Sequence, residues 1–246
     1  MKLWQGVVLG VVYLAVGYPI ARELSIPGDV RSVLFVSVLT LALAAVLLAV
    51  SPPAGRRAAF RVRRPLLGWC LAMVVGLRLM AELSTLLAYT FAYNGASTER
   101  MQGPMPLLML AVIVLGPLDE ELIFRGGIAQ GLCARISWKA GIAVSAVLFM
   151  GAHSWVQWPQ TLFTGLLLGY LCWYTGSIGY GILIHIAYNG SCFVPISGYS
   201  LLMQNAAAGT GVLLLAVAGG LALALWGLRG FTRTADRLAA EAQGPA

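Results

Sequence analysis

The stretch from Leu115 to Gly131, LGPLDEELIFRGGIAQG, decides how the rest of the sequence is interpreted. It follows an uncharged run, 106–115, and contains four ionisable residues: Asp119, Glu120, Glu121 and Arg125. An ionisable side chain in the middle of a membrane-spanning helix costs roughly 2.5–3.5 kcal/mol on insertion scales, so such side chains usually face a polar interior. If this segment crosses a bilayer, its charged residues mark a working site.

Helix geometry gives the acids different roles. Glu121 and Arg125 are spaced i,i+4, which puts them on one helix face within salt-bridge reach. Glu120 is rotated by about 100° from Glu121, and its own i+4 neighbour is the apolar Phe124. Glu120 is therefore predicted to be the unpaired carboxylate, suited to act as a general base. The alternative at this point is one buried network of all four charges with no chemistry.

The composition predicts an integral membrane protein. The 246 residues are 59% hydrophobic and only 10% charged, and the mean hydropathy is +0.84. Most of the apolar segments approach the length of about 20 residues that spans a bilayer. Eight such segments cover about 4–21, 32–50, 66–91, 106–132, 140–157, 160–175, 178–197 and 210–228. We expect an all-α fold, a polytopic bundle of about eight transmembrane helices forming a single domain over 1–246.

The distribution of basic residues predicts the topology. Arg56, Arg57, Arg61, Arg63 and Arg64 crowd the loop after the second segment, which the positive-inside rule places in the cytoplasm. Alternation from there puts both termini in the cytoplasm. It also puts six more basic residues inside: Lys2, Arg135, Lys139, Arg229, Arg233 and Arg237. Only Arg22, Arg31 and Arg100 fall outside. The net charge of +7 thus needs no nucleic-acid partner, and a patch for anionic lipid is compatible with it.

The first apolar segment, one pair of charged residues and the four cysteines are each expected to have a structural role. Only Lys2 precedes the first segment and no small-residue cleavage site follows it, so we expect a retained helix. Arg78 and Glu82 are spaced i,i+4 and are expected to pair with each other. The cysteines show no CxxC spacing and are interpreted as buried small hydrophobes: Cys70, Cys133, Cys172 and Cys192.

Both histidines of the chain fall in predicted spans. His153 ends the sequence FMGAH, and His185 opens HIAYN, in which Asn189 follows at i+4 on the same helix face. A lone intramembrane histidine is often a hydrogen-bonded packing residue. The helical rise, however, places Glu120 and Asn189 roughly 16 Å from the cytoplasmic ends of their segments, His185 roughly 10 Å and His153 roughly 21 Å. These overlapping depths predict one shared site.

Three short motifs resemble those of a known family. EELIFR (120–125) is similar to the EExxxR motif of the CPBP family, which comprises CAAX proteases and bacteriocin-processing (Abi-like) enzymes. FMGAH is similar to its FxxxH motif and HIAYN to its HxxxN motif, in the family's order. The resemblance covers about 116–190 and extends to the type II CAAX prenyl endopeptidase only in this core. It implies a protease that acts within the membrane, with a catalytic core at about 106–197.

The resemblance also implies roles for the site residues. Glu120 and His153 would activate a water molecule, and His185 with Asn189 would stabilise the oxyanion. Glu121 and Arg125 would support the helix and its charge balance. The implied partners are the lipid bilayer and a membrane-associated substrate, such as a CAAX-like tail, a leader peptide or a C-terminal anchor. The implied location is the plasma (inner) membrane, as a multi-pass protein.

The motifs leave two mechanisms and two other functions open. Glu120, His153 and His185 could ligate zinc, with water as the fourth ligand. Since HExxH is absent and Asn is a poor zinc ligand, we favour a mechanism without a metal or other cofactor. A non-catalytic protease-like scaffold or immunity protein could keep most of the motif. A proton-coupled transporter also uses acids and histidines at mid-depth, but the sequence shows no internal symmetry.

Overall fold

The computed structural model describes residues 3–13, 30–49, 60–91, 105–194 and 198–243. All regular elements in these ranges are helices. The predicted all-α class is therefore confirmed for this part of the chain. Several residues used to predict the topology lie outside the described ranges: Lys2, Arg22, Arg56, Arg57 and Arg100. Most of the predicted external loop, 92–104, lies outside them as well.

The helices follow the predicted apolar segments closely. The first three segments correspond to α1 (Leu3–Val11), α3 (Val30–Ala49), and α5 (Leu67–Met80) with α6 (Glu82–Thr90), and a short turn, η2 (Arg64–Leu66), precedes α5. Segments five to seven correspond to α11 (Trp138–Gly151), α12 (Trp158–Thr175) and α13 (Gly179–Ser191). The chain then continues through α14 (Gly198–Gln204) into α15 (Ala206–Gln243).

The acidic segment forms one continuous helical rod with two π-helical stretches. Its parts are α8 (Met105–Met109), η3 (Leu110–Leu115), α9 (Gly116–Glu120), η4 (Glu121–Ala129) and α10 (Gln130–Cys133). In η3 and η4 the backbone bonds run from residue i+5 to residue i. Such wider turns are rare overall but frequent at functional sites. Here they flank Asp119 and Glu120, and Glu121 is the first residue of η4.

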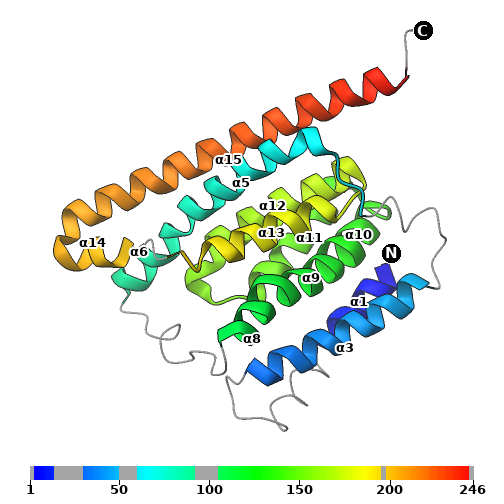
Figure 1. Cartoon of the computed structure of the whole chain (residues 1–246), viewed down its shortest axis with the longest axis horizontal. Coiled ribbons are helices and arrows are strands. Elements are labelled where there is room, and N and C mark those ends of the chain that lie inside the picture. The colour runs from blue at the N-terminus through cyan, green and yellow to red at the C-terminus, as the bar shows by residue number, and fades with distance from the viewer. Residues whose placement is uncertain (1–2, 14–29, 50–59, 92–104, 195–197, 244–246) are drawn as a thin grey trace.

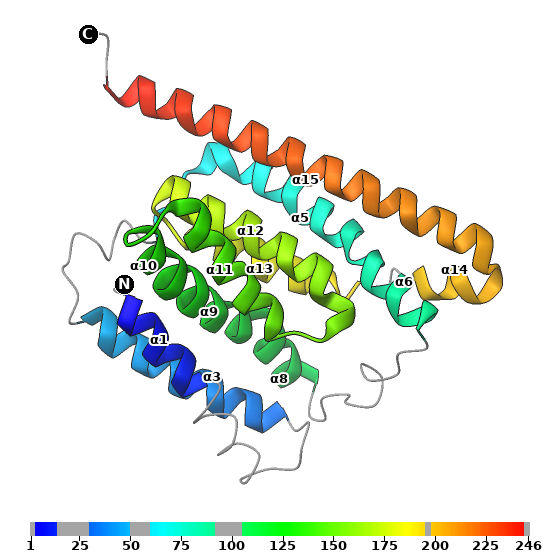
Figure 2. The same cartoon turned by 180° about the vertical axis from the view of Figure 1, so that it is seen from behind.

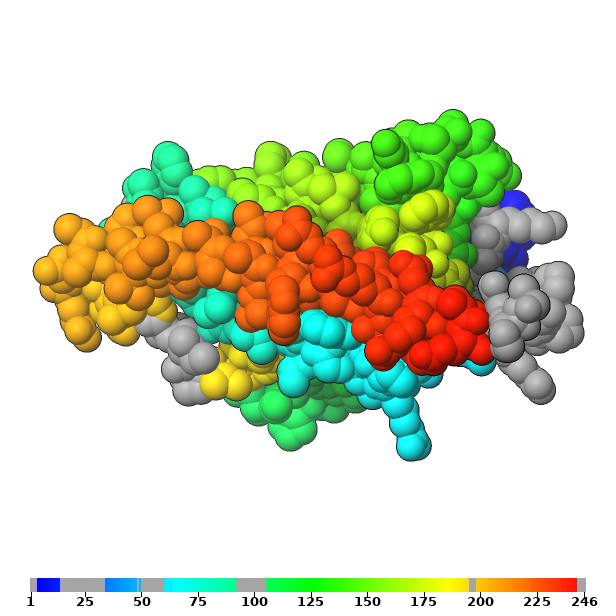
Figure 3. Space-filling model, turned by 90° about the horizontal axis from the view of Figure 1, so that it is seen from above, coloured from blue at the N-terminus to red at the C-terminus, as the bar shows by residue number. Residues whose placement is uncertain are grey.

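The longest helix covers one face of the bundle. Figure 3 shows α15 running the length of this face, and Figure 1 shows α5 beside it. The two backbones touch at a pair of glycines: a Cβ on Gly76 would lie 2.7 Å from the carbonyl oxygen of Gly220. Small residues allow this close approach, which membrane helices use in place of a hydrophobic driving force. Among the described residues, two helical stretches are long and apolar enough to cross a membrane, Arg64–Thr90, which includes α5, and Ala206–Ala242, which lies in α15.

The opposite side of the bundle is covered by α1 and α3. Figures 1 and 2 show these two helices lying along the acidic rod, on the side away from α15. A Cβ on Gly6 of α1 would lie 2.4 Å from the Cα of Gly127 in η4, so the two backbones are in direct contact. Between the two covering layers lie α11, α12 and α13. The acidic rod is thus packed on both sides by other helices.

Several boundaries differ from the sequence prediction, among them the end of α13 at Ser191, where the segment was predicted to run to residue 197. The last predicted segment ended at residue 228, but α15 continues to Gln243, because residues after 228 remain good helix formers on an amphipathic pattern. Phe231 packs in the core while Arg233 and Arg237 are exposed. The fifth segment was predicted to run through His153 to residue 157. Instead α11 ends at Gly151, and His153 lies in the following turn, before the short helix η5 (Trp155–Gln157).

The basic residues gather at one end of the molecule. Figure 1 shows that the start of α5, the rod at α10 and the C-terminal part of α15 all lie toward this end. The described basic residues there are Arg61, Arg63, Arg64, Arg135, Lys139, Arg229, Arg233 and Arg237. The predicted Arg78–Glu82 pair is present farther along the α5–α6 rod, with Arg78 Nη1 2.8 Å from Glu82 Oε1.

Candidate active site

Glu121 lies at the centre of a buried ion-pair network. Its Oε1 lies 2.9 Å from Nη1 of Arg125 in an ion pair, which is the pair predicted from the i,i+4 spacing. The same oxygen lies 3.0 Å from Nδ1 of His185 on α13. A carboxylate accepts hydrogen bonds, so this contact suits the tautomer in which Nδ1 of His185 is protonated. Glu121 therefore fixes the orientation of the imidazole as well as balancing the arginine.

Glu120 lies on the other side of the same imidazole. Its Oε2 is 3.6 Å from Nε2 of His185, so the ring stands between two carboxylates. The Glu120 side chain is 18% exposed, whereas that of Glu121 is fully buried. Glu120 has no arginine partner among the described residues. The accessible acid is therefore the one without a fixed positive charge beside it, as the helix geometry predicted.

His153 approaches the site from the turn after α11. Its Nδ1 lies 2.9 Å from the carbonyl oxygen of Phe149. Phe149 is in the last turn of α11, where carbonyl groups lack the next turn of helix as a hydrogen-bond donor. The carbonyl oxygen of His153 accepts from Nε1 of Trp158 at 3.0 Å. Within the described ranges, these two bonds leave Nε2 of the imidazole without a hydrogen-bond partner. No hydrogen bond or ion pair joins His153 to Glu120 within the part of the chain that the structure describes.

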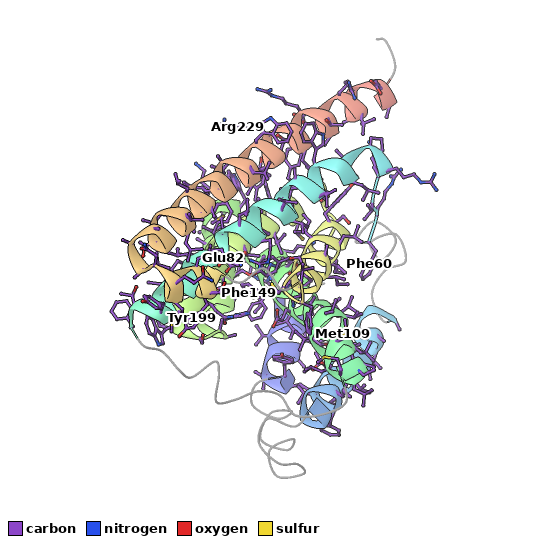
Figure 4. The ribbon with its side chains drawn as sticks, turned by 60° about the vertical axis from the view of Figure 1, so that its left-hand side comes forward. Phe60, Glu82, Met109, Phe149, Tyr199 and Arg229 are labelled. Carbon is purple, nitrogen blue, oxygen red and sulfur yellow. The ribbon has the colours of Figure 1, made fainter. Side chains whose placement is uncertain are left out.

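Phe149 brings the separate parts of the site together. Its ring centroid lies 4.6 Å from that of His153 and 5.9 Å from that of His185. The guanidinium carbon of Arg125 lies 4.2 Å from the ring centroid, a cation–π contact. Figure 4 shows Phe149 in the middle of the bundle. Phe149 is the first residue of FMGAH and had no predicted role, although its i,i+4 spacing to His153 was a usable signal.

Asn189 lies one helical turn beyond His185 on α13. Its Nδ2 donates to the carbonyl oxygen of Val112 in η3 at 2.9 Å. An asparagine amide has two N–H donors, so this bond orients the group while leaving one donor for another acceptor. His185 and Asn189 are thus both held by the acidic rod, the first through a carboxylate and the second through a backbone carbonyl.

Three polar residues in and beside the HIAYN motif had no predicted role: Tyr188, Gln160 and Ser84. Nε2 of Gln160 on α12 donates to the hydroxyl of Tyr188, the residue before Asn189. Oε1 of Gln160 accepts from the Ser84 hydroxyl of α6 at 3.4 Å. This chain of bonds ties α13 to its neighbours.

Asp119, the first of the three acids, is fully buried and has the Ser37 hydroxyl of α3 as its polar neighbour, outside the network around His185.

The comparison with protein families identifies the segment that contains these residues. Residues 102–191 match the family described as type II CAAX prenyl endopeptidase Rce1-like. The chain carries an Rce1-like domain. The domain includes all the predicted catalytic residues, whereas α5, α6, α14 and α15 lie outside the matched segment. No protein of curated function and no solved structure is similar to the chain at a significant level.

The Rce1-like domain offers no ready metal cage in this arrangement. Among the described residues, no three His, Cys, Asp or Glu side chains are placed to hold one metal ion. The zinc alternative would need Glu120, His153 and His185 to converge. Here the Phe149 ring lies against both imidazoles, and Glu121 already occupies Nδ1 of His185.

Removing the arginine of the Rce1-like domain is expected to destabilise the fold. Arg125 is 1% exposed and its partner Glu121 is fully buried, so Arg125→Ala leaves an uncompensated buried carboxylate. Breaking a buried pair in this way costs about 3–5 kcal/mol. Arg237→Ala is the matched control, because Arg237 and Glu241 have the same i,i+4 spacing but are both exposed. Thermal unfolding in detergent should show a large loss for the first variant and little change for the second. Equal effects would contradict the burial argument.

Proposed function

We propose that the Rce1-like domain is an intramembrane endopeptidase in which glutamate and histidine activate water. The observation that carries this proposal is the His185 imidazole standing between Glu121, which is buried and neutralised by Arg125, and Glu120, which is partly exposed. Two carboxylates on one helix are thereby given different environments. Such a difference is what separates a general base from an orienting group. The family name supports a protease, and the residue roles are our proposal.

The proposed reaction is the hydrolysis of one peptide bond. Glu120 takes a proton from water, and the resulting oxygen nucleophile bonds to the carbonyl carbon. The developing oxyanion accepts hydrogen bonds from Asn189 Nδ2 and from Nε2–H of His185. Because Nδ1–H of His185 is bonded to Glu121, this step requires the imidazole to be protonated on both nitrogens. As the carbon–nitrogen bond breaks, the proton held by Glu120 passes to the leaving amine. His153, whose ring lies against that of Phe149, assists the water through Nε2, because its Nδ1 is bonded to the Phe149 carbonyl.

The proposed setting is a multi-pass protein of the plasma (inner) membrane with both termini in the cytoplasm. The gathering of basic residues at one end of the bundle supports this orientation through the positive-inside rule. The proposed unit is a single membrane domain of about eight spans, with its catalytic core at about 106–197. Cysteine labelling after residue 60 and at the C-terminus tests the orientation. Labelling from outside at either position would reverse it.

The proposed substrate is a peptide or protein held at the membrane, such as a CAAX-like tail, a leader peptide or a C-terminal anchor. The membrane-like composition and the name of the matched family support this class. The decisive experiment compares membrane fractions from cells with wild type and with Glu120→Ala by proteomics of peptide termini. Termini present only with wild type would identify substrates. If no terminus depends on Glu120, the protease proposal fails and a non-catalytic scaffold remains.

A further inference from the structure

The backbone of the acidic rod contains a gap in its hydrogen bonding just before the acids. In η3 the bonds run over five residues, and the amide of Gly116 donates to the carbonyl oxygen of Ala111. The same pattern continued by one residue would pair the amide of residue 117 with the carbonyl of Val112. Residue 117 is proline, which has no amide hydrogen to donate. The Val112 carbonyl therefore lacks its partner within the helix.

The missing bond is supplied by the proposed oxyanion donor. Nδ2 of Asn189 donates to this same carbonyl oxygen at 2.9 Å, across 77 residues of sequence. Pro117 is buried, and a carbonyl left without a partner beside it would be unfavourable, because a polar group removed from water needs a hydrogen bond. Pro117 differs from a proline at a free helix start, because the rod continues on its N-terminal side through η3. Pro65 lies in the first turn before α5, where a proline removes no needed bond.

We propose that Pro117 is a positioning residue that reserves the Val112 carbonyl for Asn189. By withholding an amide hydrogen, Pro117 leaves the carbonyl free to bind one of the two Nδ2 hydrogens. The amide group is then fixed in rotation, and its second hydrogen has a defined direction. Preorganisation of this kind is what makes a hydrogen-bond donor effective toward an oxyanion. The consequence for turnover rests on the proposed function, but the structural link does not.

The structural link can be tested without any substrate. Pro117→Ala restores an amide that competes for Val112, and alanine is the better helix former, so the variant is expected to fold. The chain contains only three asparagines, Asn94, Asn189 and Asn205, so protein labelled with ¹⁵N at asparagine gives three side-chain amide pairs. We expect Pro117→Ala to shift the Asn189 pair and to leave that of Asn205 in place. Pro65→Ala should shift neither. An unshifted Asn189 pair in Pro117→Ala would overturn the proposal.

The kinetic arm uses a farnesylated, fluorophore-labelled CAAX peptide as the probe. Pro117→Ala is expected to lower kcat by about tenfold with little change in KM, since the ground-state contacts remain. In an Asn189→Ala background the same substitution should change kcat by less than about twofold, because residues that act through one another are not additive. Full additivity would overturn the positioning role. A further outcome is that wild type fails to cleave this peptide while Pro117→Ala still shifts the Asn189 pair. That result would contradict the substrate or the proposed function, and it would support the structural link between Pro117 and Asn189.

Discussion

Replacing Glu120 with glutamine is expected to abolish measurable cleavage while leaving the protein folded. Glutamine keeps the size and the hydrogen-bonding reach of the side chain but cannot take a proton from water. General-base catalysis contributes about 10²–10⁴-fold, so turnover should fall by at least that factor. Because Glu120 is partly exposed and has no arginine partner in the described structure, its loss leaves no buried charge stranded. Purified variant and wild type would be compared by turnover of one substrate and by thermal unfolding.

Glu121→Gln is the matched control on the same helix. Glu121 is fully buried and bonded to both Arg125 and His185, so this variant strands the arginine and releases the imidazole. We expect it to lower the melting temperature as well as the activity. The two neighbouring acids are thus predicted to separate activity from stability. Turnover by Glu120→Gln at the wild-type rate would remove Glu120 from the mechanism, and identical melting of both variants would refute the difference in environment.

The sequence was sufficient to predict the helices because their signal is local. Apolar segments of sufficient length predicted the all-α class and the places of α3, α11, α12 and α13. The end of α15 was predicted too early because the sequence after residue 228 changes from uniformly apolar to amphipathic, and only the packing of residues such as Phe231 shows that the helix continues. The π-helical turns were not predictable, since they arise from packing around the rod and not from residue preference.

The site was predictable to the extent that its contacts are local. The Glu121–Arg125 pair follows from i,i+4 spacing on one helix. The bond between Glu121 and His185 spans 64 residues and has no sequence signal, so Glu121 was assigned to charge balance alone. The bond from Asn189 to Val112 is equally non-local. What the sequence could not supply is which groups orient the catalytic residues, because that depends on how α13 packs against the acidic rod.

Replacing His185 with alanine is expected to have the second largest effect, a loss of turnover of about 10²–10³-fold or more. The imidazole carries the proton that Glu121 fixes, and it stands between that acid and Glu120. Its removal deletes one proposed oxyanion donor and brings two carboxylates together without a group between them. His153→Ala is the comparison, because His153 contacts the Phe149 ring but neither acid in the described structure. We expect the loss of activity to be smaller for His153→Ala, measured as kcat on the same substrate.

The same two variants decide whether a metal takes part. If His153 and His185 are zinc ligands, either substitution should release metal together with activity, since each supplies a ligand that the site cannot replace. If Glu120 activates water directly, a strong chelator should change the turnover of wild type little, and metal content should not follow activity across the variants. We expect the second pattern, because His185 is committed through Nδ1 to Glu121 and the Phe149 ring lies against both imidazoles. Stoichiometric zinc in wild type, with activity lost on chelation and restored by zinc, would disprove the metal-free mechanism and require the site to close around Glu120.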